Sequence, residues 1–257
     1  MNKKINKILN KKNKTKIVCL TAYSSNMSKI LDNYCDLILV GDSLANVLYG
    51  MNNTHNMTVN MMAAHATSVK KVIRKSLCVV DMPFGSYKNK NLALKNAKKI
   101  MKESKCDAIK IENNNKNYQI IIDLVKANIP VMGHIGYTPQ FKKKFKVEGN
   151  TLPSEKKIIQ QALKVQEAGA FSIVLECISS KASKKITQAL RIPTIGIGSS
   201  VNCDGQILVT DDLLGLGDFR AKFIKKYVNL NKIIEKSIQK YRNDIIKCKF
   251  PTSRNSY

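Results

Sequence analysis

Short runs rich in Val, Ile and Leu alternate with longer amphipathic stretches from residue 16 to about residue 210, and no low-complexity linker interrupts them. This alternation is typical of a parallel sheet, because parallel strands need helical crossovers between them. At roughly 32 residues per strand–helix unit, the length fits a (β/α)₈ TIM barrel of the α/β class; a doubly wound open sheet is the alternative. The eight candidate strands are Ile17–Ala22, Leu37–Asp42, Leu77–Asp81, Ala108–Glu112, Pro130–His134, Phe171–Glu176, Thr194–Gly198 and Gln206–Val209.

Two of the intervening stretches carry specific helix signals. From Val59 to Ile73 the apolar residues recur at about 3.6-residue spacing, and Thr58 precedes them as a candidate N-cap. A second apolar stripe follows Pro153 and ends at Gly169, where a left-handed residue would close the helix. Both patterns predict helices that pack one face against the sheet.

The two ends of the chain lie outside the repeating pattern. The stretch up to Lys16 has seven lysines, no acidic residue and no signal-peptide-like apolar core, so we expect an untargeted, partly frayed basic arm over about 1–15. Apolar residues at helical spacing predict a helical tail over about 229–257, which would cover the barrel or a partner subunit. We therefore expect a single barrel domain spanning residues 1–257 with these two appendages.

The chain is strongly basic, with 44 Lys and Arg against 18 Asp and Glu and a net charge of +26. Such a charge brings a nucleic-acid partner into consideration. However, only five of the basic residues are arginine, the lysines are spread along the chain, and Trp is absent. We therefore predict a solvated lysine- and asparagine-rich surface and no nucleic-acid partner, and an anionic ligand would dock at the clusters Lys3–Lys16 or Lys142–Lys146.

Apolar runs and cysteines indicate the compartment. No apolar run approaches the roughly 18 to 20 residues that cross a bilayer, so we expect no membrane partner. The seven cysteines are scattered and never form a C-x-x-C pair, which argues against disulfides and against structural zinc. This pattern predicts a reducing, cytoplasmic location.

Five of the predicted strands carry an ionisable side chain at or beside their end, where a buried parallel strand would otherwise stay apolar. In a (β/α)₈ barrel these ends meet at the C-terminal face, where active sites are built. One such residue alone is more often a helix cap or turn former. The whole set would be costly to desolvate without a cation or a substrate, so it predicts a functional site. The set consists of Asp42 with Ser43, Asp81, Lys110, Glu112, His134 and Glu176.

Three of these residues have the chemistry of a magnesium site. Asp42, Asp81 and Glu112 supply hard oxygen donors, and no cysteine or multiple-histidine cluster accompanies them, which favours Mg²⁺ over zinc. Lys110 lies two residues before Glu112, so the strand pleat points both side chains to the same face. Lys110 would stay charged and bind a substrate carboxylate, rather than form a Schiff base; a buried Lys–Glu pair is the structural alternative.

Glu176 and His134 are candidates for proton transfer and charge stabilisation. Glu176 follows the apolar run Ile173-Val174-Leu175, which should raise its carboxylate pKa toward the range of a general base. His134 has small neighbours and would donate a hydrogen bond to a developing oxyanion.

The glycine-rich segment GIGSSVNCDG follows the seventh predicted strand. Val201 stands where the third glycine of a G-x-G-x-x-G fingerprint would be, so the dinucleotide-binding motif fails. A phosphate-binding turn and a tight turn that permits close ligand approach both remain open.

Several stretches resemble the ketopantoate hydroxymethyltransferase family of pantothenate biosynthesis, and they occur in the family's order along almost the whole chain. They are TAYSSNMSKI from Thr21, LVGDSL from Leu39, VDMPFGSY from Val80, IKIE from Ile109, GHIGYTPQ from Gly133, VLEC from Val174 and IPTIGIGSSVNCDGQILV from Ile192. The resemblance implies a (β/α)₈ barrel, a divalent metal that is usually Mg²⁺, 5,10-methylenetetrahydrofolate as co-substrate, and a homo-oligomer, commonly a decamer.

The resemblance also implies roles for single residues. Asp42 and Asp81 are similar to metal ligands that also bind substrate, with Glu112 completing the carboxylate shell. Glu176 matches the proton-abstracting base. The remaining substrate contacts that the motifs imply are Ser43, Lys110, His134 and, in T-A-Y, Tyr23.

The chain departs from the family pattern at three places. Ser24 follows T-A-Y where the family often has Asp, and Ser199-Ser200 stand where Ala-Gly is common. The loop after TPQ reads FKKKFKVEGN over residues 141–150, and the resemblance implies that this loop covers the folate side of the site.

The resemblance implies transfer of a hydroxymethyl group from 5,10-methylenetetrahydrofolate to 3-methyl-2-oxobutanoate, giving ketopantoate and tetrahydrofolate. The metal would assist enolate formation, with Glu176 as the base. The alternatives are another Mg²⁺-dependent enzyme that forms or cleaves a carbon–carbon bond of a 2-oxoacid, and a basic nucleic-acid-binding protein that has kept an inactive barrel. A requirement for folate in turnover would distinguish the hydroxymethyl transfer from the other Mg²⁺-dependent reactions. Salt-dependent affinity for DNA, together with no ketoacid binding, would indicate the nucleic-acid-binding protein.

Overall fold

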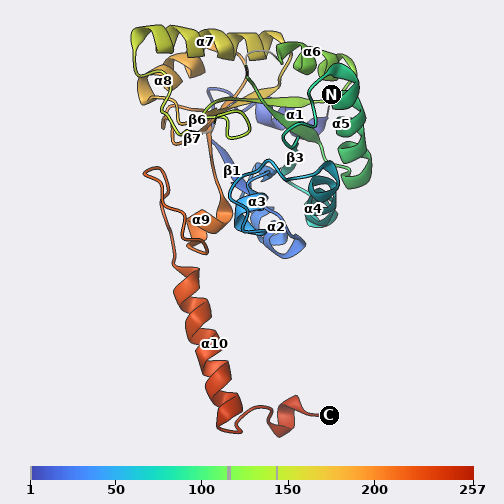
Figure 1. Ribbon diagram of the computed structural model, residues 1–257, viewed down its shortest axis with the longest axis vertical. Helices are drawn as coiled ribbons and strands as arrows, with labels where there is room; N and C mark the ends of the chain where they lie inside the picture. Colours follow the sequence, from blue (N-terminus) through green and yellow to red (C-terminus); the bar gives the residue numbers. More distant parts are fainter. Residues whose placement is uncertain (1, 115–116, 143) are drawn as a thin grey trace. The chain divides into compact units, whose positions relative to one another are not determined.

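The computed structural model describes residues 2–114, 117–142 and 144–257 and contains a closed barrel of eight parallel strands (Figure 1). Each strand pairs with the next along the chain, and β8 pairs with β1 to close the barrel, with Ile17 opposite Gly205. The predicted (β/α)₈ fold is confirmed, and the open-sheet alternative is wrong. The strands are β1 (Ile17–Thr21), β2 (Leu37–Val40), β3 (Leu77–Asp81), β4 (Ala108–Glu112), β5 (Val131–Gly136), β6 (Ser172–Glu176), β7 (Thr194–Ile197) and β8 (Gly205–Leu208).

Helices follow the strands and cover the outside of the barrel (Figure 1). The Thr58 side chain caps α4 by accepting from the Met61 N–H, as predicted. The cap of α7 is Thr151, and Gly169 lies just past its end with φ of 93°. A Cβ at Gly169 would lie 3.0 Å from Val125 Cγ1, so the turn needs glycine for both conformation and space. These helices are α2 (Ser25–Leu31), α3 (Leu44–Val47), α4 (Val59–Val72), α5 (Lys90–Ser104), α6 (Tyr118–Lys126), α7 (Leu152–Glu167) and α8 (Ser180–Ala189).

The pleat of each strand divides the core into two layers. In β4, Ile109 and Ile111 pack outward against the helices, whereas Ala108 packs inside the barrel. Lys110 and Glu112 share the inward face with Ala108, because side chains two residues apart point to the same side. The interior is therefore apolar near the strand starts and polar at the strand ends. The other apolar inner residues of the neighbouring strands are Leu37, Leu39, Leu77, Val79, Met132 and Val174.

The N-terminal segment is an ordered helix, so the expectation of a partly frayed arm is wrong. Helix α1 (Lys3–Leu9) is capped by the Asn2 side chain, and Ile5 and Ile8 are fully buried in the interior cluster of the barrel. Lys4 Nζ donates to the Ser76 carbonyl at 2.8 Å and fixes the helix against the start of β3. The helix forms because its two isoleucines close the N-terminal end of the barrel, while Lys3 and Lys7 are exposed.

Residues Thr210–Tyr257 form a second compact unit. It contains α9 (Thr210–Leu214), α10 (Leu230–Ile246) and the short 3₁₀ helix η1 (Ser253–Asn255). Helix α10 lies within the tail predicted over about 229–257, and its apolar side chains are exposed, with Ile238 at 60%. The partner that this face covers stays a prediction.

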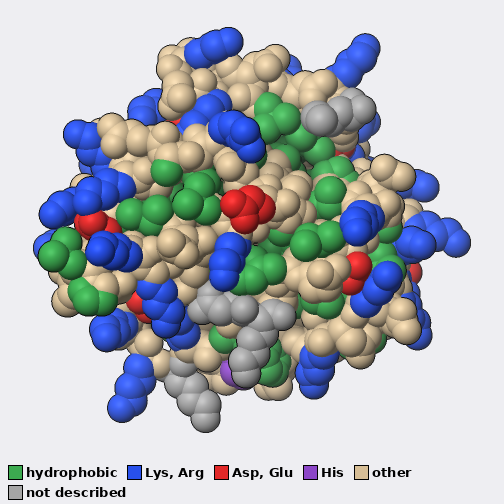
Figure 2. All heavy atoms as spheres, turned by 90° about the horizontal axis from the view of Figure 1, so that it is seen from above, with side chains coloured by type: hydrophobic (Ala, Val, Ile, Leu, Met, Phe, Trp, Pro, Cys, Tyr) green, Lys and Arg blue, Asp and Glu red, His purple; other side chains and the backbone are tan. Residues whose placement is uncertain are grey.

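The charges are dispersed on the face of the molecule in Figure 2. Lys and Arg side chains are spread over that face rather than gathered in one stripe. Among the described residues, no helix combines the length and the apolar character needed to span a bilayer.

Candidate active site

The inward face of the barrel brings the predicted strand-end residues to one mouth. Strand register pairs Asp81 with Lys110, Glu112 with His134, and Gly136 with Glu176. Asp42 lies two residues past the end of β2, and its backbone N–H donates to Asp81 Oδ2 at 3.0 Å. Neighbouring strands thus join side chains that are about 30 residues apart in the sequence, as the barrel topology requires.

Lys110 pairs with Asp81 at the centre of the cluster, and both side chains are buried. Lys110 Nζ lies 2.9 Å from Asp81 Oδ1. Burial raises the pKa of Asp81 to about 6, with Asp42 reinforcing the shift and Lys110 opposing it. Burial alone would lower the pKa of Lys110, but the charges of Asp81, Glu112 and Asp42 raise it above its usual value. The direction of this shift agrees with the expectation of a charged lysine, and the electrostatic role of Lys110 stays a prediction.

Glu112 is held by a loop residue that the sequence did not identify. The Gln140 backbone N–H donates to Glu112 Oε2 at 3.0 Å, and Gln140 Nε2 donates to Asp42 Oδ2 at 2.8 Å. Burial raises the pKa of Glu112 well above its usual value, and the charge of Asp42 adds to the shift. Gln140 is itself only 2% exposed and links two of the three predicted metal ligands.

The three carboxylates do not form a ready-made metal cluster. Within residues 2–114, 117–142 and 144–257, no three His, Cys, Asp or Glu side chains stand in an arrangement that could hold a metal ion. Gln140 donates a hydrogen bond to one oxygen of Asp42 and to one oxygen of Glu112, and Lys110 forms an ion pair with Asp81. The ligand set Asp42, Asp81 and Glu112 therefore stays a prediction.

The donor chemistry nevertheless fits a hard divalent cation. The carboxylates of Asp42, Asp81 and Glu112 are buried close to one another. Repulsion from the charge of Asp42 contributes to the raised pKa of Asp81 and of Glu112. Asp81 Oδ1 contacts Lys110 but makes no hydrogen bond to any described residue. A cation that keeps waters and substrate oxygens in its shell needs only one or two protein carboxylates. Such an ion would offset the repulsion between the buried oxygens.

His134 stands between Lys110 and Glu176. Its Nδ1 lies 3.2 Å from Lys110 Nζ, and its Nε2 lies 3.2 Å from Glu176 Oε2. Burial lowers the pKa of His134 well below its usual value, and the charge of Lys110 lowers it further, so the ring is neutral. Because an ammonium only donates, Nδ1 accepts and the ring proton sits on Nε2. That N–H lies beside Glu176 Oε2 without meeting the geometry of a hydrogen bond, so a ligand oxygen at the mouth could accept from it.

Glu176 ends β6, and its side chain is 18% exposed, in contrast to the fully buried Glu112. Desolvation by the surrounding protein raises the pKa of Glu176 to about 7, with Lys110 acting in the opposite direction. The expectation of a raised pKa is confirmed. A carboxylate with this pKa is well suited to accept a proton near neutral pH.

Tyr23 and Ser43 lie at the ends of the first two strands. The Tyr23 hydroxyl and Ser43 Oγ are 2.8 Å apart. Gly41, just before Asp42, has no room for a side chain, because a Cβ there would lie 2.9 Å from Ser43 Oγ and 3.6 Å from Asp81 Oδ2. The glycine of LVGDSL thus allows Ser43 and Asp81 to approach the backbone closely.

The rewritten loop over residues 141–150 is folded back against the strand ends; Lys143 lies outside the described residues. Lys142 Nζ donates to the Gly136 carbonyl at 2.6 Å and pairs with Glu148 at 2.8 Å. The Phe145 ring packs edge-on against Tyr137, which follows β5, at 5.5 Å between ring centroids. The loop therefore presents aromatic rings beside the mouth.

The glycine-rich segment after β7 forms a tight turn whose polar groups are used internally. Ser199 Oγ donates to the Leu175 carbonyl at 2.6 Å and accepts from the Ile178 N–H. Ser200 Oγ accepts from the Asn202 N–H at 3.2 Å. These contacts favour the close-packed turn over a phosphate-binding loop.

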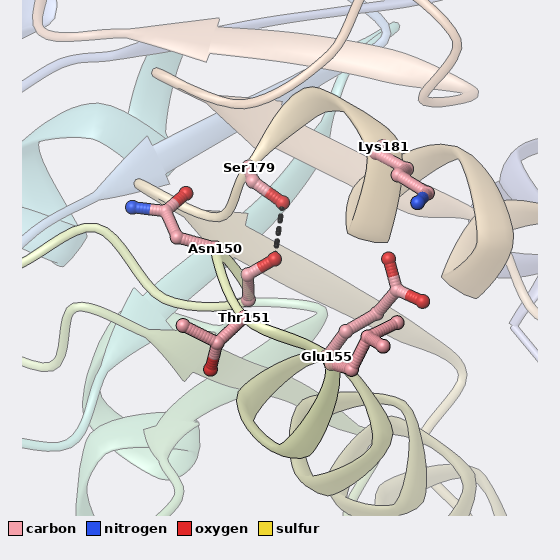
Figure 3. Close-up of a pocket in the computed structure, with 7 residues that line it drawn as sticks. Asn150, Thr151, Glu155, Ser179 and Lys181 are labelled. Atoms are coloured by element: carbon pink, nitrogen blue, oxygen red, sulfur yellow. Dashed lines mark hydrogen bonds between the residues drawn. The ribbon is translucent and has the colours of Figure 1, made fainter.

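A separate cavity of about 220 Å³ lies outside this cluster. The Ser179 hydroxyl donates to the Gly149 carbonyl at 2.7 Å within it (Figure 3). The cavity contains none of the predicted site residues. Its lining consists of Gly149, Asn150, Thr151, Leu152, Glu155, Ser179 and Lys181.

Two residues of the cluster, Gln140 and Tyr87, were missed by the sequence analysis. Tyr87 is buried, and its hydroxyl donates to Gln140 Oε1. Both residues come from loops, where no periodic pattern distinguishes a buried polar side chain from a solvated one. The position of Gln140 directly after T-P in GHIGYTPQ was the one available signal.

Comparison with known proteins gives consistent matches along the whole chain. A family model described as ketopantoate hydroxymethyltransferase matches residues 2–253. Proteins named 3-methyl-2-oxobutanoate hydroxymethyltransferase are similar: one from Pelagibacter ubique is 51% identical over all of both chains, and one from Anaplasma marginale is 46% identical over 96% of this chain and 90% of its own. A third, from Rhizobium etli, is 44% identical over 94% of this chain and 90% of its own.

Solved structures resemble the fold at much lower identity. A 2,3-dimethylmalate lyase of the PEP mutase/isocitrate lyase superfamily has a TM-score of 0.64 at 13% identity and covers 95% of this chain and 89% of its own. A phosphonopyruvate hydrolase in complex with oxalate and Mg²⁺ has a TM-score of 0.62 at 10% identity and covers 98% of this chain and 93% of its own. These likenesses concern the barrel alone.

Proposed function

Because the chain belongs to the ketopantoate hydroxymethyltransferase family, we propose that it transfers the one-carbon unit of 5,10-methylenetetrahydrofolate to 3-methyl-2-oxobutanoate and releases ketopantoate and tetrahydrofolate. The family match makes it a hydroxymethyltransferase of the pantothenate pathway and sets aside the other reactions considered from the sequence. The observation that carries the choice of reaction is Glu176, with a pKa near 7, beside a neutral His134.

Each residue at the mouth has a separate role in the proposed reaction. Glu176 removes the proton at C3 of the ketoacid, since it is the carboxylate of the cluster that solvent reaches. His134 Nε2–H, which lies 3.2 Å from Glu176 Oε2, donates to the substrate oxygen on which negative charge develops. Lys110 stays charged throughout and compensates the substrate carboxylate. Tyr23 and Ser43 contact the ketoacid from the first two strands.

Asp42, Asp81 and Glu112 would hold a divalent cation, and the hardness of their oxygens favours Mg²⁺. When bound, this ion supplies Lewis-acid polarisation of the ketoacid oxygens, which acidifies the C3 proton. A related barrel was solved with oxalate and Mg²⁺, and oxalate presents two adjacent oxygen-bearing carbons as a 2-oxoacid does. That likeness supports the assignment of the cation.

The folate would approach beside the aromatic rings of the rewritten loop. The Tyr137 backbone N–H donates to the Glu176 backbone carbonyl at 2.8 Å, and the Phe145 ring packs on the Tyr137 ring. Flat aromatic side chains favour a planar heterocycle through stacking. The exposed face of α10 further supports a homo-oligomer, with a decamer as the proposed assembly, and the unpaired cysteines support a cytoplasmic location.

Purified enzyme should convert 3-methyl-2-oxobutanoate only when 5,10-methylenetetrahydrofolate and a divalent cation are both present. Chelation should abolish turnover, because the carboxylates alone cannot polarise the ketoacid, and added Mg²⁺ should restore it. The measurement is tetrahydrofolate release with each component omitted in turn. Turnover that persists without folate, or in excess chelator, would contradict the proposed reaction.

Proton removal should depend on pH through Glu176. The base works ionised, so with a pKa of about 7 the rate of C3 exchange should rise about tenfold per pH unit below pH 7 and level off above it. The measurement is deuterium wash-out from C3 between pH 5 and pH 9 at saturating metal. A rate that is already level at pH 5, as for a carboxylate of ordinary pKa, would remove Glu176 from this role.

A further inference from the structure

Gln140 is the most extensively bonded polar side chain of the cluster, although it comes from a loop. Its Nε2 donates to Asp42 Oδ2 at 2.8 Å and to the Met82 carbonyl at 3.0 Å. Its backbone N–H donates to Glu112 Oε2 at 3.0 Å. A single residue thus connects the ends of β2, β3 and β4.

The orientation of the Gln140 amide is determined by its neighbours. Tyr87 donates its hydroxyl hydrogen to Oε1, and the Met82 carbonyl can only accept, so the NH₂ group must face Met82 and Asp42. Tyr87 and Gln140 are both buried, at 4% and 2% exposure, so water does not compete for these bonds. The amide cannot flip without leaving a buried carbonyl oxygen against the Met82 oxygen.

The bonds from Gln140 act on carboxylates that repel each other. Asp42, Asp81 and Glu112 are all buried at one mouth, and the Asp42 backbone N–H donates to Asp81 Oδ2 at 3.0 Å. Hydrogen bonds donated to a carboxylate favour its charged form and fix which oxygen remains free. Without the Gln140 side chain, Asp42 Oδ2 would lose its amide donor and could rotate, whereas the bond from the backbone N–H of residue 140 to Glu112 would remain.

We propose that Gln140 is a positioning residue, which orients the Asp42 and Glu112 carboxylates toward the cation and the ketoacid, and that Tyr87 fixes the amide in the orientation required. The proposal rests on the proposed function, because it assigns a task to these carboxylates. Partners that orient the ligands of a metal commonly affect both affinity and turnover. Gln140 therefore acts through the Asp42 and Glu112 carboxylates.

The test replaces Gln140 with Met, which keeps the size and removes every side-chain hydrogen bond. We expect kcat to fall by roughly 10- to 100-fold and Mn²⁺ affinity to weaken by a similar factor, as for the loss of other ligand-orienting partners. Free Mn²⁺ is measured by electron paramagnetic resonance on metal-stripped enzyme without substrates, and thermal unfolding is recorded alongside. A purely structural role would lower the melting temperature and leave the Mn²⁺ affinity of the folded protein unchanged.

Gln119→Met is the matched control. Gln119 also donates its amide to a carboxylate, Asp123 at 3.2 Å, but it is exposed on α6. This variant should retain wild-type kcat and Mn²⁺ affinity, because the bond that it loses lies outside the mouth. Equal losses in Gln119→Met and Gln140→Met would assign the effect to the substitution and overturn the proposal.

Tyr87→Phe gives a second, milder variant in case Gln140→Met does not fold. Removing the hydroxyl releases Oε1, and we expect roughly a threefold to tenfold loss of Mn²⁺ affinity, in keeping with one lost hydrogen bond. In a Gln140→Met background the same change should have little further effect, because its partner is already gone. Additive losses, or Mn²⁺ affinity within twofold of wild type in every variant that folds, would overturn the proposal.

The two proposals fail in different ways. Absence of folate-dependent turnover in the wild-type enzyme would contradict the proposed function, while the Mn²⁺ affinities would still decide the role of Gln140. A wild-type protein with no measurable affinity for Mn²⁺ would overturn the role of Gln140 directly.

Discussion

Replacing Glu176 with Gln should slow removal of the C3 proton of 3-methyl-2-oxobutanoate by about 10²- to 10⁴-fold, the usual contribution of a general base. The amide keeps the shape of the carboxylate but cannot accept the proton. Ketoacid binding should persist, since Lys110 and the carboxylates of Asp42 and Asp81 are unchanged. Deuterium wash-out from C3 measures the chemical step, and calorimetric titration with ketoacid measures binding.

Glu167→Gln is the control for this change, because Glu167 is an exposed glutamate at the end of α7. It should exchange the C3 proton at the wild-type rate. If Glu176→Gln also exchanged at that rate, another group would have to be the base. If it lost ketoacid binding as well, Glu176 would be a binding residue rather than the base alone.

Replacing Lys110 with Met should lower the free energy of unfolding of the metal-free protein by about 3–5 kcal/mol, the usual result of breaking a buried ion pair from one side. Lys110 Nζ lies 2.9 Å from Asp81 Oδ1 and offsets the charges of Asp42 and Glu112. Methionine fills the same space but leaves these carboxylates without compensation. Denaturant unfolding monitored by circular dichroism gives the measurement.

The loss should depend on pH in a definite direction. Asp81 already has a pKa of about 6, above its ordinary value of 3.8, and without Lys110 its pKa should rise further. The folded variant then binds a proton that the unfolded chain releases, so its stability falls as pH rises from 4 and recovers as pH is lowered. The defect should therefore be larger at pH 8 than at pH 5.

The exposed pair Lys99–Glu103 provides the comparison for Lys110. The two side chains are 41% and 44% exposed at a 2.6 Å contact, so Lys99→Met should cost well under about 1 kcal/mol. The double variant Lys110→Met with Asp81→Asn should be less destabilised than Lys110→Met alone, because it removes one uncompensated charge. A Lys110→Met protein as stable as Lys99→Met would mean that the cluster is protonated and needs no cation.

The barrel could be predicted from the sequence because the eight apolar runs and the helices between them follow a regular period. Strand limits were accurate to within two residues: β2 ends at Val40, two residues before Asp42, and β5 continues to Gly136, two residues beyond His134. Helix α1 was missed because its lysines dominate the composition of the segment. Its helical signal consists of only two buried side chains, Ile5 and Ile8.

The gathering of strand-end residues was predictable, because barrel topology brings them to one face whatever their distance in sequence. Their pairing was not, since it depends on strand register: Asp81 stands opposite Lys110, and Glu112 opposite His134. The hydrogen bonds of Gln140 were also out of reach, because they depend on how a loop folds over the mouth. Residue roles inferred from the family resemblance stay predictions until the variants are measured.

Helix α1 has a practical implication for anyone preparing this enzyme. A lysine-rich N-terminal segment invites trimming or replacement by an affinity tag, yet Ile5 and Ile8 belong to the apolar cluster that fills the barrel interior. Cutting it away would expose the apolar residues of this cluster to water at the N-terminal end of the barrel. A purification tag is better placed where α1 stays intact.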